Sequence, residues 1–333
     1  MKTNPPAKAH SGLTSPGDDL ISRRPFEEYA RLSLKIYNPR RVKDYRRMLV
    51  FMVRALANNR QMKDLLGFFQ RSPLHRKIAA ALPAVYEQAT RQFFYKNSTF
   101  EERSALIQSH FRLLFDWLTE AAITRLYLED GITLWTAEFE ERPLALKLSY
   151  HAERKKEGLL ALVLTFDKKN IYQANFWFAR SPGAAPGLWV GALQGTPGGR
   201  DTVRDLTKSL FGYRPKNLII YGLRLLCREL GISQLRAVSN GGYYANNHFR
   251  IDRKLKTLLD DFWEETGGHL GSDPRFFELP ADEPRKGAEE VEPRKRSLYR
   301  KRFALLDTID ATFTENLRPF LRARANSGPE AQK

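Results

Sequence analysis

The sequence predicts an α+β protein with an N-terminal helical region, a central, mainly antiparallel sheet flanked by helices, and a long C-terminal helix. From about residue 26 to 121, apolar residues recur every three or four positions, which is typical of amphipathic helices. From about residue 122 they form runs of eight to ten residues joined by short polar links, which is typical of antiparallel hairpins. Beyond residue 200, helical and strand patterns alternate.

These changes of pattern divide the 333 residues into six segments. Residues 1–25 are rich in Pro, Ser and Gly and lack the apolar stretch of a secretory signal, so we expect a tail there and a second tail at 326–333. The other segments are a basic helical region (26–121), an α/β sheet domain (122–280), a linker rich in Pro and charged residues (281–293) and a C-terminal helix that packs on the sheet domain (294–325).

Capping and turn signals predict the individual elements. Ser98 and Glu101 lie three residues apart and predict a capping box at a helix start. Strands are predicted at 131–139, 143–151, 158–167, 170–179, 186–195, 233–239 and 274–280. Helices are predicted at 201–212, 214–231 and 260–268, the second with Pro215 in its first turn and Gly231 at its end.

Composition narrows the class of protein. With 42% hydrophobic and 12% aromatic residues the chain can bury a core, and no run approaches the roughly 18–20 apolar residues of a membrane span. The single cysteine, Cys227, lies in an apolar helical run, which predicts a buried, unreactive thiol. These features predict a cytoplasmic protein.

The formal net charge is +17, and the largest excess lies in the first 120 residues, which hold 21 Lys and Arg against 11 Asp and Glu. Such a surplus attracts nucleic acid, anionic lipid or nucleotide cofactors. Within it, Val42, Tyr45, Leu49, Met52 and Val53 share one side of a predicted helix, with Arg and Lys mostly opposite. This spacing predicts an apolar inner face and a basic outer face.

The stretch "GALQGTPGGRD", residues 191–201, has the pattern of a strand end, a glycine-rich bend and a helix start. A meander followed by a bend, helices and a further strand resembles the GNAT-type acyltransferases, in which backbone N–H groups at a helix start hold the acyl-CoA pyrophosphate. The resemblance implies a GNAT-like, acyltransferase-like sheet domain with CoA or acyl-CoA as cofactor. Pro197 and Gly199 stand where the GNAT loop has glycines, and a plain Gly/Pro turn is the alternative.

Two groups of residues are candidates for this cofactor site. Gln194, Gly195, Gly198, Gly199 and Arg200 belong to the bend itself. Arg214 and Lys216 begin the next predicted helix and form an alternative anion site.

Candidate catalytic and substrate residues lie in two later stretches. In "DDFWEETGG" acids surround aromatic rings, and a carboxylate beside buried rings has a raised pKa and can act as a general base. In "SNGGYYANNHF" polar side chains follow a predicted strand. A solvated helix face and an Asn-Gly-Gly turn are the respective alternatives. The candidates are Glu264, Glu265, Tyr244 and Asn240 for catalysis, and Trp263 and His248 for substrate contact. The six histidines lack paired metal spacing, so no metal is predicted.

Five short motifs occur in one order: "LTKSLFGYRPKNLIIYGL", "LRAVSN", "DDFWEETGG", "FFELP" and "PRKRSLYRKRFALLD". On these motifs the chain resembles the VirK/YbjX family of bacterial proteins, from about residue 40 to 320. Tyr243 and Tyr244 stand where the family usually has a histidine, so a His-based mechanism is in doubt. The family's Thr-Lys … Gly-x-Arg-Pro-Lys pattern falls on Thr207, Lys208, Gly212, Arg214, Pro215 and Lys216. The resemblance implies roles in virulence, envelope integrity and resistance to cationic antimicrobial peptides, and it implies no established reaction.

Two functions of different classes follow. The first is an acyl-CoA-dependent, N-acyltransferase-like enzyme acting on a small-molecule or envelope-related substrate. The alternative is a non-catalytic basic binding or regulatory protein whose N-terminal helices engage nucleic acid or the anionic membrane surface. Tyr45, Phe93, Phe94 and Tyr95 would stack on bases in the nucleic-acid version, and otherwise belong to the helical core.

Overall fold

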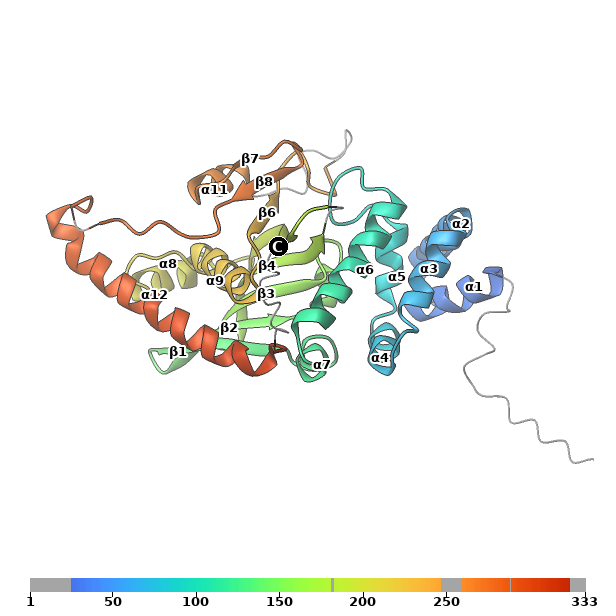
Figure 1. The fold of residues 1–333 in the computed structure, drawn as a ribbon, viewed down its shortest axis with the longest axis horizontal. Helices are drawn as coiled ribbons and strands as arrows, with labels where there is room; N and C mark the ends of the chain where they lie inside the picture. Colours follow the sequence, from blue (N-terminus) through green and yellow to red (C-terminus); the bar gives the residue numbers. More distant parts are fainter. Residues whose placement is uncertain (1–24, 181–182, 247–258, 288, 324–333) are drawn as a thin grey trace, which may run out of the picture. The chain divides into compact units, whose positions relative to one another are not determined.

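The computed structural model describes residues 25–180, 183–246, 259–287 and 289–323 (Figure 1). The chain separates into two compact units, Met1–Asn59 and Arg60–Lys333. The structure is α+β with a long C-terminal helix, so the predicted fold class is confirmed at that level. The GNAT-type arrangement and the predicted domain boundaries stay predictions.

In the first unit, α1 (Pro25–Ile36) packs against α2 (Val42–Ala57). Phe51 is 1% exposed and meets the ring of Tyr37 edge-on, with 6.2 Å between ring centroids. The predicted inner face of α2 is wrong, because Val42 and Leu49 are 86% and 64% exposed. The helix carries two apolar faces, and the structure buries the one that holds Phe51 and Ala55.

In the described residues of the second unit, eight strands form one sheet in the order β1-β2-β3-β4-β5-β6-β8-β7. β1 to β5 form an antiparallel meander, β5 and β6 pair in parallel, and β8 pairs antiparallel with β6 and β7. The strands are β1 (Ile132–Phe139), β2 (Arg142–Ser149), β3 (Leu160–Phe166), β4 (Lys169–Arg180), β5 (Pro186–Gly195), β6 (Gln234–Val238), β7 (His269–Leu270) and β8 (Phe276–Leu279). The mainly antiparallel sheet is therefore confirmed, and β7 was not predicted.

Helices precede and follow the meander. They are α3 (Asn59–Phe68), α4 (Pro73–Ala81), α5 (Ala84–Thr90), α6 (Phe100–Trp117), α7 (Glu120–Leu128), α8 (Arg200–Ser209), α9 (Pro215–Leu230), α11 (Asp260–Glu265) and α12 (Arg296–Leu317). α6 does begin at a capping box, but the pair is Thr99 and Glu102, one residue later than the predicted Ser98 and Glu101. Ser98 is instead buried, and its hydroxyl donates to the Phe93 carbonyl.

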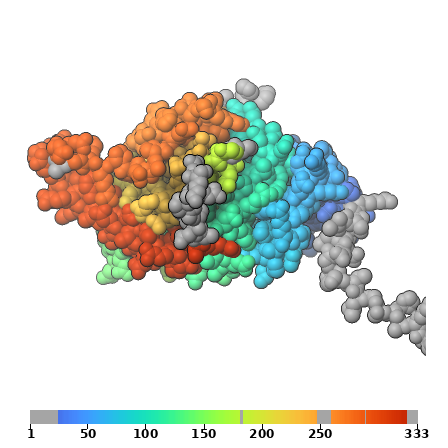
Figure 2. Space-filling model, in the orientation of Figure 1, coloured from blue at the N-terminus to red at the C-terminus, as the bar shows by residue number. Residues whose placement is uncertain are grey.

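One face of the sheet is covered by α9 and α12 (Figure 1). Gly222 lets α9 approach closely, since a Cβ there would lie 2.8 Å from the side chains of Leu146 and Leu162. α12 packs on β1, and in the space-filling view it lies beside α9 (Figure 2). Cys227 on α9 is 1% exposed and burial raises the pKa of its thiol to about 12, so the predicted buried thiol is confirmed.

α6 lies along the edge of β4 that β3 leaves unpaired. β3 pairs with β4 only as far as Phe176, and beyond that point Phe178 N donates to His110 Nδ1 at 3.0 Å. Arg180 N donates to Ser109 Oγ at 3.0 Å. Side chains of α6 therefore satisfy backbone groups that would otherwise form an open sheet edge.

Candidate functional site

The glycine-rich bend between β5 and α8 is an exposed turn. Thr196 N donates to the Ile171 carbonyl at 2.9 Å, and Gly199 N donates to the Thr196 carbonyl at 3.2 Å. Gly198 has a φ of +80°, which favours glycine. The ring of Tyr172 covers Gly195, where a Cβ would lie 2.9 Å from it. Two amides of the bend are therefore already bonded within the protein.

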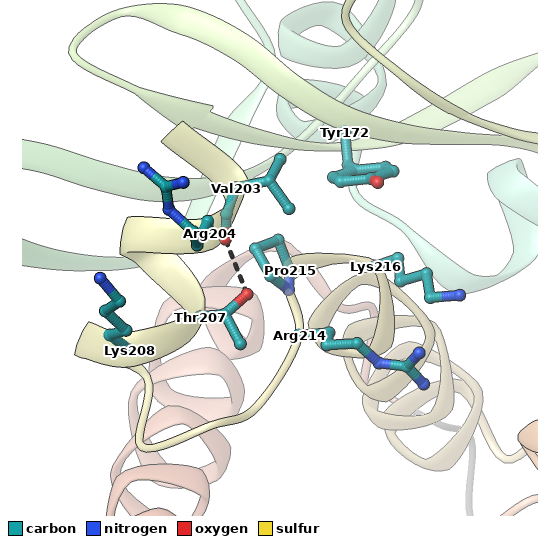
Figure 3. Close-up of a pocket in the computed structure, with 8 residues that line it drawn as sticks. All are labelled: Tyr172, Val203, Arg204, Thr207, Lys208, Arg214, Pro215 and Lys216. Atoms are coloured by element: carbon teal, nitrogen blue, oxygen red, sulfur yellow. Dashed lines mark hydrogen bonds between the residues drawn. The ribbon is translucent and has the colours of Figure 1, made fainter. Parts of the chain in front are cut away.

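A pocket of about 350 Å³ lies between α8 and α9, against β4 (Figure 3). We call it the basic pocket, and it is lined by Tyr172, Val203, Arg204, Thr207, Lys208, Arg214, Pro215 and Lys216. Figure 3 shows Val203, Pro215 and the Tyr172 ring facing its middle, with the charged ends of Arg204 and Lys208 extending to one side and those of Arg214 and Lys216 to the other. The pocket therefore has an apolar floor and a cationic rim. It contains two of the predicted cofactor residues, Arg214 and Lys216.

In the described residues, few acidic side chains lie near the Lys and Arg side chains of the basic pocket. Arg214 forms an ion pair with Glu265 of α11, and Glu265 Oε2 lies 3.6 Å from Lys216 Nζ. Lys216 Nζ also lies 4.2 Å from the centroid of the Phe262 ring. Burial, followed by the charge of Arg214, lowers the pKa of Lys216. The structure thus brings predicted catalytic Glu265 to two predicted cofactor residues, and both Glu264 and Glu265 are exposed.

On α8 the rim cations pair only with exposed neighbours. Arg204 lies 3.2 Å from Asp201 and 3.7 Å from Asp205, and Lys208 lies 3.6 Å from Asp205. Such exposed pairs contribute at most about 1 kcal/mol. An anionic ligand at the rim can therefore displace them at low cost.

Trp263 contacts the end of β6, just beyond the last residue pair of β6 with β5, Ala237 with Val190. Its Nε1 donates to the carbonyl of Val238, the last residue of β6, at 3.0 Å, and the side chain is fully buried. The next N–H along the chain, that of Ser239, donates to the Arg275 carbonyl, which lies on the β8 side of β6. The Val238 C=O belongs to the same trans peptide as this N–H, and the two groups point in opposite directions. The Val238 carbonyl therefore points toward β5. The indole lies at that junction rather than in an open cleft.

Asn240 links the end of β6 to α11. Its backbone N donates to Asp260 Oδ1 at 2.7 Å, and its Oδ1 accepts from Leu259 N at 2.9 Å. Burial raises the pKa of Asp260. These contacts hold the loop in place, and they occupy the side-chain oxygen of Asn240, one of the residues predicted for catalysis. The predicted substrate residue His248 lies outside the described residues.

Glu157 is a buried acid that the sequence analysis did not single out. It is 4% exposed, and both its oxygens accept from Gln194 Nε2 at 2.9 Å. Tyr243 Oη donates to Glu157 Oε1 at 2.7 Å, and Tyr243 shares a further side-chain hydrogen bond with Tyr244. Burial raises the pKa of Glu157, while the Tyr243 hydrogen bond and the charge of Arg154 partly oppose that rise.

Glu157 was missed because it lies in "AERKKE", which has the composition of a solvated hairpin link. The signal for it lies in β5, where Gly191 interrupts an apolar run. A Cβ at Gly191 would lie 1.9 Å from the Glu157 carbonyl oxygen. A glycine inside a strand often marks such a close backbone approach.

A second pocket, of about 200 Å³, is lined in part by Gln194, the residue that donates to Glu157. We call it the polar pocket, and it is lined by His151, Glu153, Arg154, Asn170, Tyr172, Gln173, Gln194, Gly195, Thr196 and Pro197. Gln194 belongs to this lining and donates to Glu157, and Tyr172 lines both pockets. A ligand anchored in one pocket can therefore extend past Tyr172 toward the other.

The fold and these pockets define an α+β protein with a cationic-rimmed pocket and, sharing Tyr172 with it, a polar pocket whose Gln194 donates to a buried acid. In the described ranges no group of three or more His, Cys, Asp or Glu side chains could hold a metal ion. The chain belongs to the family described as "Protein of unknown function (DUF535)", whose family model matches residues 40–315.

Three comparisons put this membership in context. An uncharacterized protein of Haemophilus influenzae is 27% identical over 277 residues, covering 75% of this chain and 89% of that protein. The uncharacterized protein YbjX of Escherichia coli K12 is 24% identical over 265 residues, covering 78% and 80%. The sequence resemblance to the VirK/YbjX family is thus confirmed. A crystal structure of a protein of unknown function from Aquifex aeolicus VF5 matches with a TM-score of 0.20, 15% identity and coverage of 59% and 98%.

Among the residues that the structure describes, no helix has the length and apolar character needed to cross a bilayer.

Proposed function

We propose that this chain is an acyltransferase-like enzyme whose acyl donor is a CoA-type thioester. The observation that carries the proposal is the basic pocket, which combines an apolar floor with four Lys and Arg side chains in about 350 Å³. An organic phosphate has the matching character, since its phosphates suit the cationic rim and its apolar parts suit the floor. The crossover from β5 through α8 and α9 to the parallel strand β6 supports the same class.

The residues of the basic pocket fit part of such a donor. Arg204 and Lys208 on one side and Arg214 and Lys216 on the other would hold phosphate oxygens. A pocket of this volume takes only part of CoA, so the rest of the molecule would run past Tyr172 toward the polar pocket. When bound, the thioester would supply the activated acyl group.

Glu157 would receive the proton released by the acceptor. An amine that attacks the thioester carbonyl carbon forms a C–N bond, expels CoA as its thiolate when the C–S bond breaks, and must lose one proton. In our proposal that proton passes to the Tyr244 oxygen. At the same time Tyr244 gives its own hydroxyl proton to Tyr243, and Tyr243 gives its hydroxyl proton to Glu157 Oε1. Both tyrosines end as they began, and Glu157 ends neutral. The 2.7 Å Tyr243–Glu157 hydrogen bond supports this route. Because the family resemblance implies a role in envelope integrity, we expect an envelope-related amine as acceptor.

Ligand binding tests the pocket without requiring the acceptor. We expect saturating CoA to raise the melting temperature by several degrees, because a ligand at about 100 times its Kd stabilises a protein by about 2.7 kcal/mol. The double variant Arg204→Ala, Lys208→Ala should bind CoA at least about tenfold more weakly by calorimetry. Each substitution removes a charge-assisted contact of about 1.5–3 kcal/mol.

The matched control removes two exposed positive charges elsewhere, Lys63→Ala with Lys301→Ala. It should leave the Kd within about twofold. If neither CoA nor inorganic diphosphate shifts the melting temperature at millimolar concentration, the proposed donor site is wrong.

A further inference from the structure

The exposed side of α2 is a continuous apolar stripe. It consists of Val42, Tyr45, Leu49, Val53 and Leu56, whose exposed fractions are 86%, 59%, 64%, 56% and 38%. These positions are three or four residues apart and therefore share one side of the helix. At 1.5 Å per residue the stripe is about 21 Å long. A row of large apolar side chains facing water usually marks an interaction surface.

Positive charge borders this stripe. Lys43, Arg46 and Arg47 are exposed on the same helix. The one acid of α2, Asp44, is buried and accepts a 3.1 Å hydrogen bond from Arg47 Nη1. Residues 1–59 hold 12 Lys and Arg against 5 Asp and Glu, a net charge of +7. The stripe therefore lies in a strongly cationic unit.

We propose that α2 docks this stripe into the headgroup region of an anionic lipid bilayer. An amphipathic helix that lies in the plane of the interface places apolar side chains at the acyl boundary and Lys and Arg at the anionic headgroups. Tyr45 suits that depth because its ring is apolar and its hydroxyl is polar.

The charge pattern favours lipid over other occupants. Two copies of the chain packed stripe to stripe would bring their Lys43 and Arg46 side chains together without acids between them. Nucleic acid would match the charge and leave the apolar stripe in water. Of the aromatics that would stack on bases, Phe93, Phe94 and Tyr95 are at most 9% exposed. An anionic membrane matches both features of α2.

Vesicle flotation of the full chain tests the proposal. We expect the protein to float with vesicles of phosphatidylcholine and phosphatidylglycerol and to stay in the soluble fraction with phosphatidylcholine alone. Raising the salt from 0.1 to 0.5 M should weaken binding, because surface attraction is screened. Equal binding to both vesicle types, or binding to neither, would overturn the proposal.

Double variants distinguish the effect of the α2 stripe and its neighbouring charges from the effect of exposed leucines elsewhere on the chain. Leu49→Ser with Val53→Ser should reduce partitioning at least about tenfold, as expected when two anchoring side chains are lost. Lys43→Glu with Arg46→Glu should do the same, because each basic residue near the surface contributes about fivefold. The control Leu270→Ser with Leu298→Ser changes two exposed leucines elsewhere and should float like the parent.

A different result would assign α2 to another occupant. If the stripe variants float like the parent, α2 is not the anchor. If instead the parent is a dimer by light scattering and Leu49→Ser with Val53→Ser is a monomer, the stripe binds a second copy, and the lipid proposal is wrong.

Discussion

At the scale of single residues, His110 shows how the partners of one buried side chain fix which atoms donate and which accept its hydrogen bonds. It is completely buried; Nδ1 accepts from Phe178 N, and Nε2 lies 2.6 Å from Tyr127 Oη. Tyr127 Oη donates to the Leu159 carbonyl, so Nε2–H must donate to Tyr127. The ring is therefore neutral in a fixed tautomer, and burial lowers the pKa of His110 to about 3.

This shift predicts a loss of stability in acid. Above pH 6.5 His110 is neutral in both the folded and the unfolded chain, so its full contribution is present. As the pH falls from 6.5 toward 3, only the unfolded chain takes up the proton. The free energy of unfolding should then drop by up to about 1.4 kcal/mol per pH unit from this group. Urea unfolding of the parent and of His110→Gln between pH 7 and 4 measures it.

The His110→Gln variant should show the shallower pH slope, although it is less stable at pH 7. The control His269→Gln removes a histidine whose side chain is 74% exposed and should keep the parent slope. Parallel slopes in the parent and His110→Gln would contradict the assignment of a neutral buried ring.

Glu157 carries the second prediction at this scale. Glu157→Gln keeps the shape of the side chain and removes its capacity to take a proton at neutral pH. We expect acyl transfer from an acyl-CoA to an amine to fall about 10²-fold or more, the usual contribution of a general base, while the Kd for CoA stays within about twofold. Product formation followed by mass spectrometry, with calorimetry for CoA, separates the two effects.

Tyr243→Phe should slow transfer to a similar degree, because it removes the hydroxyl between Tyr244 and Glu157. Unchanged transfer in Glu157→Gln would assign this acid a structural role, holding its segment to Gln194 and Tyr243.

At the scale of secondary-structure elements, the close approach of β5 to the segment before β3 depends on Gly191. A Cβ at this position would lie 1.9 Å from the Glu157 carbonyl oxygen and 2.8 Å from the Trp177 ring. Gly191→Ala should therefore destabilise the protein by about 1–3 kcal/mol through overpacking. Chemical denaturation measures the change. Gly67→Ala in α3 is the matched control, since nothing lies within 4 Å of the added methyl, and it should be neutral or stabilising by up to about 1 kcal/mol.

The same scale shows what the sequence predicts well. The first five strands are separated by short polar links and carry strong apolar runs, so they were located nearly residue for residue, and 186–195 coincides with β5. The two-residue turns at Glu140–Glu141 and Asp167–Lys168 take positive φ angles that suit tight hairpins. Local patterns of this kind do not depend on distant packing.

Features that depend on distant partners were predicted less well. α2 has two apolar faces, and only packing against α1 decides which is buried. Glu157 has the appearance of a solvated link residue until Gln194 and Tyr243, which lie far along the chain, enclose it. The basic pocket was predicted in part, because Arg214 and Lys216 begin α9, whereas Arg204 and Lys208 join them only through the packing of α8 on α9.

At the scale of the whole molecule, the two proposals lie in different compact units. The α2 stripe belongs to Met1–Asn59, and both pockets belong to Arg60–Lys333. Each unit has buried side chains of its own, such as Phe51 in the first and Trp177 in the second. Changes at sites that share no contacts usually act independently.

We therefore expect lipid docking and CoA binding to be independent. Leu49→Ser with Val53→Ser should leave the Kd for CoA within about twofold, and Arg204→Ala with Lys208→Ala should leave flotation unchanged. Calorimetry in the presence and absence of anionic vesicles completes the cycle. The opposite result would be a change of more than about fivefold in the CoA Kd on adding vesicles that the stripe variant abolishes. It would demonstrate coupling between the units, because linkage requires that each ligand alter the affinity for the other by the same factor.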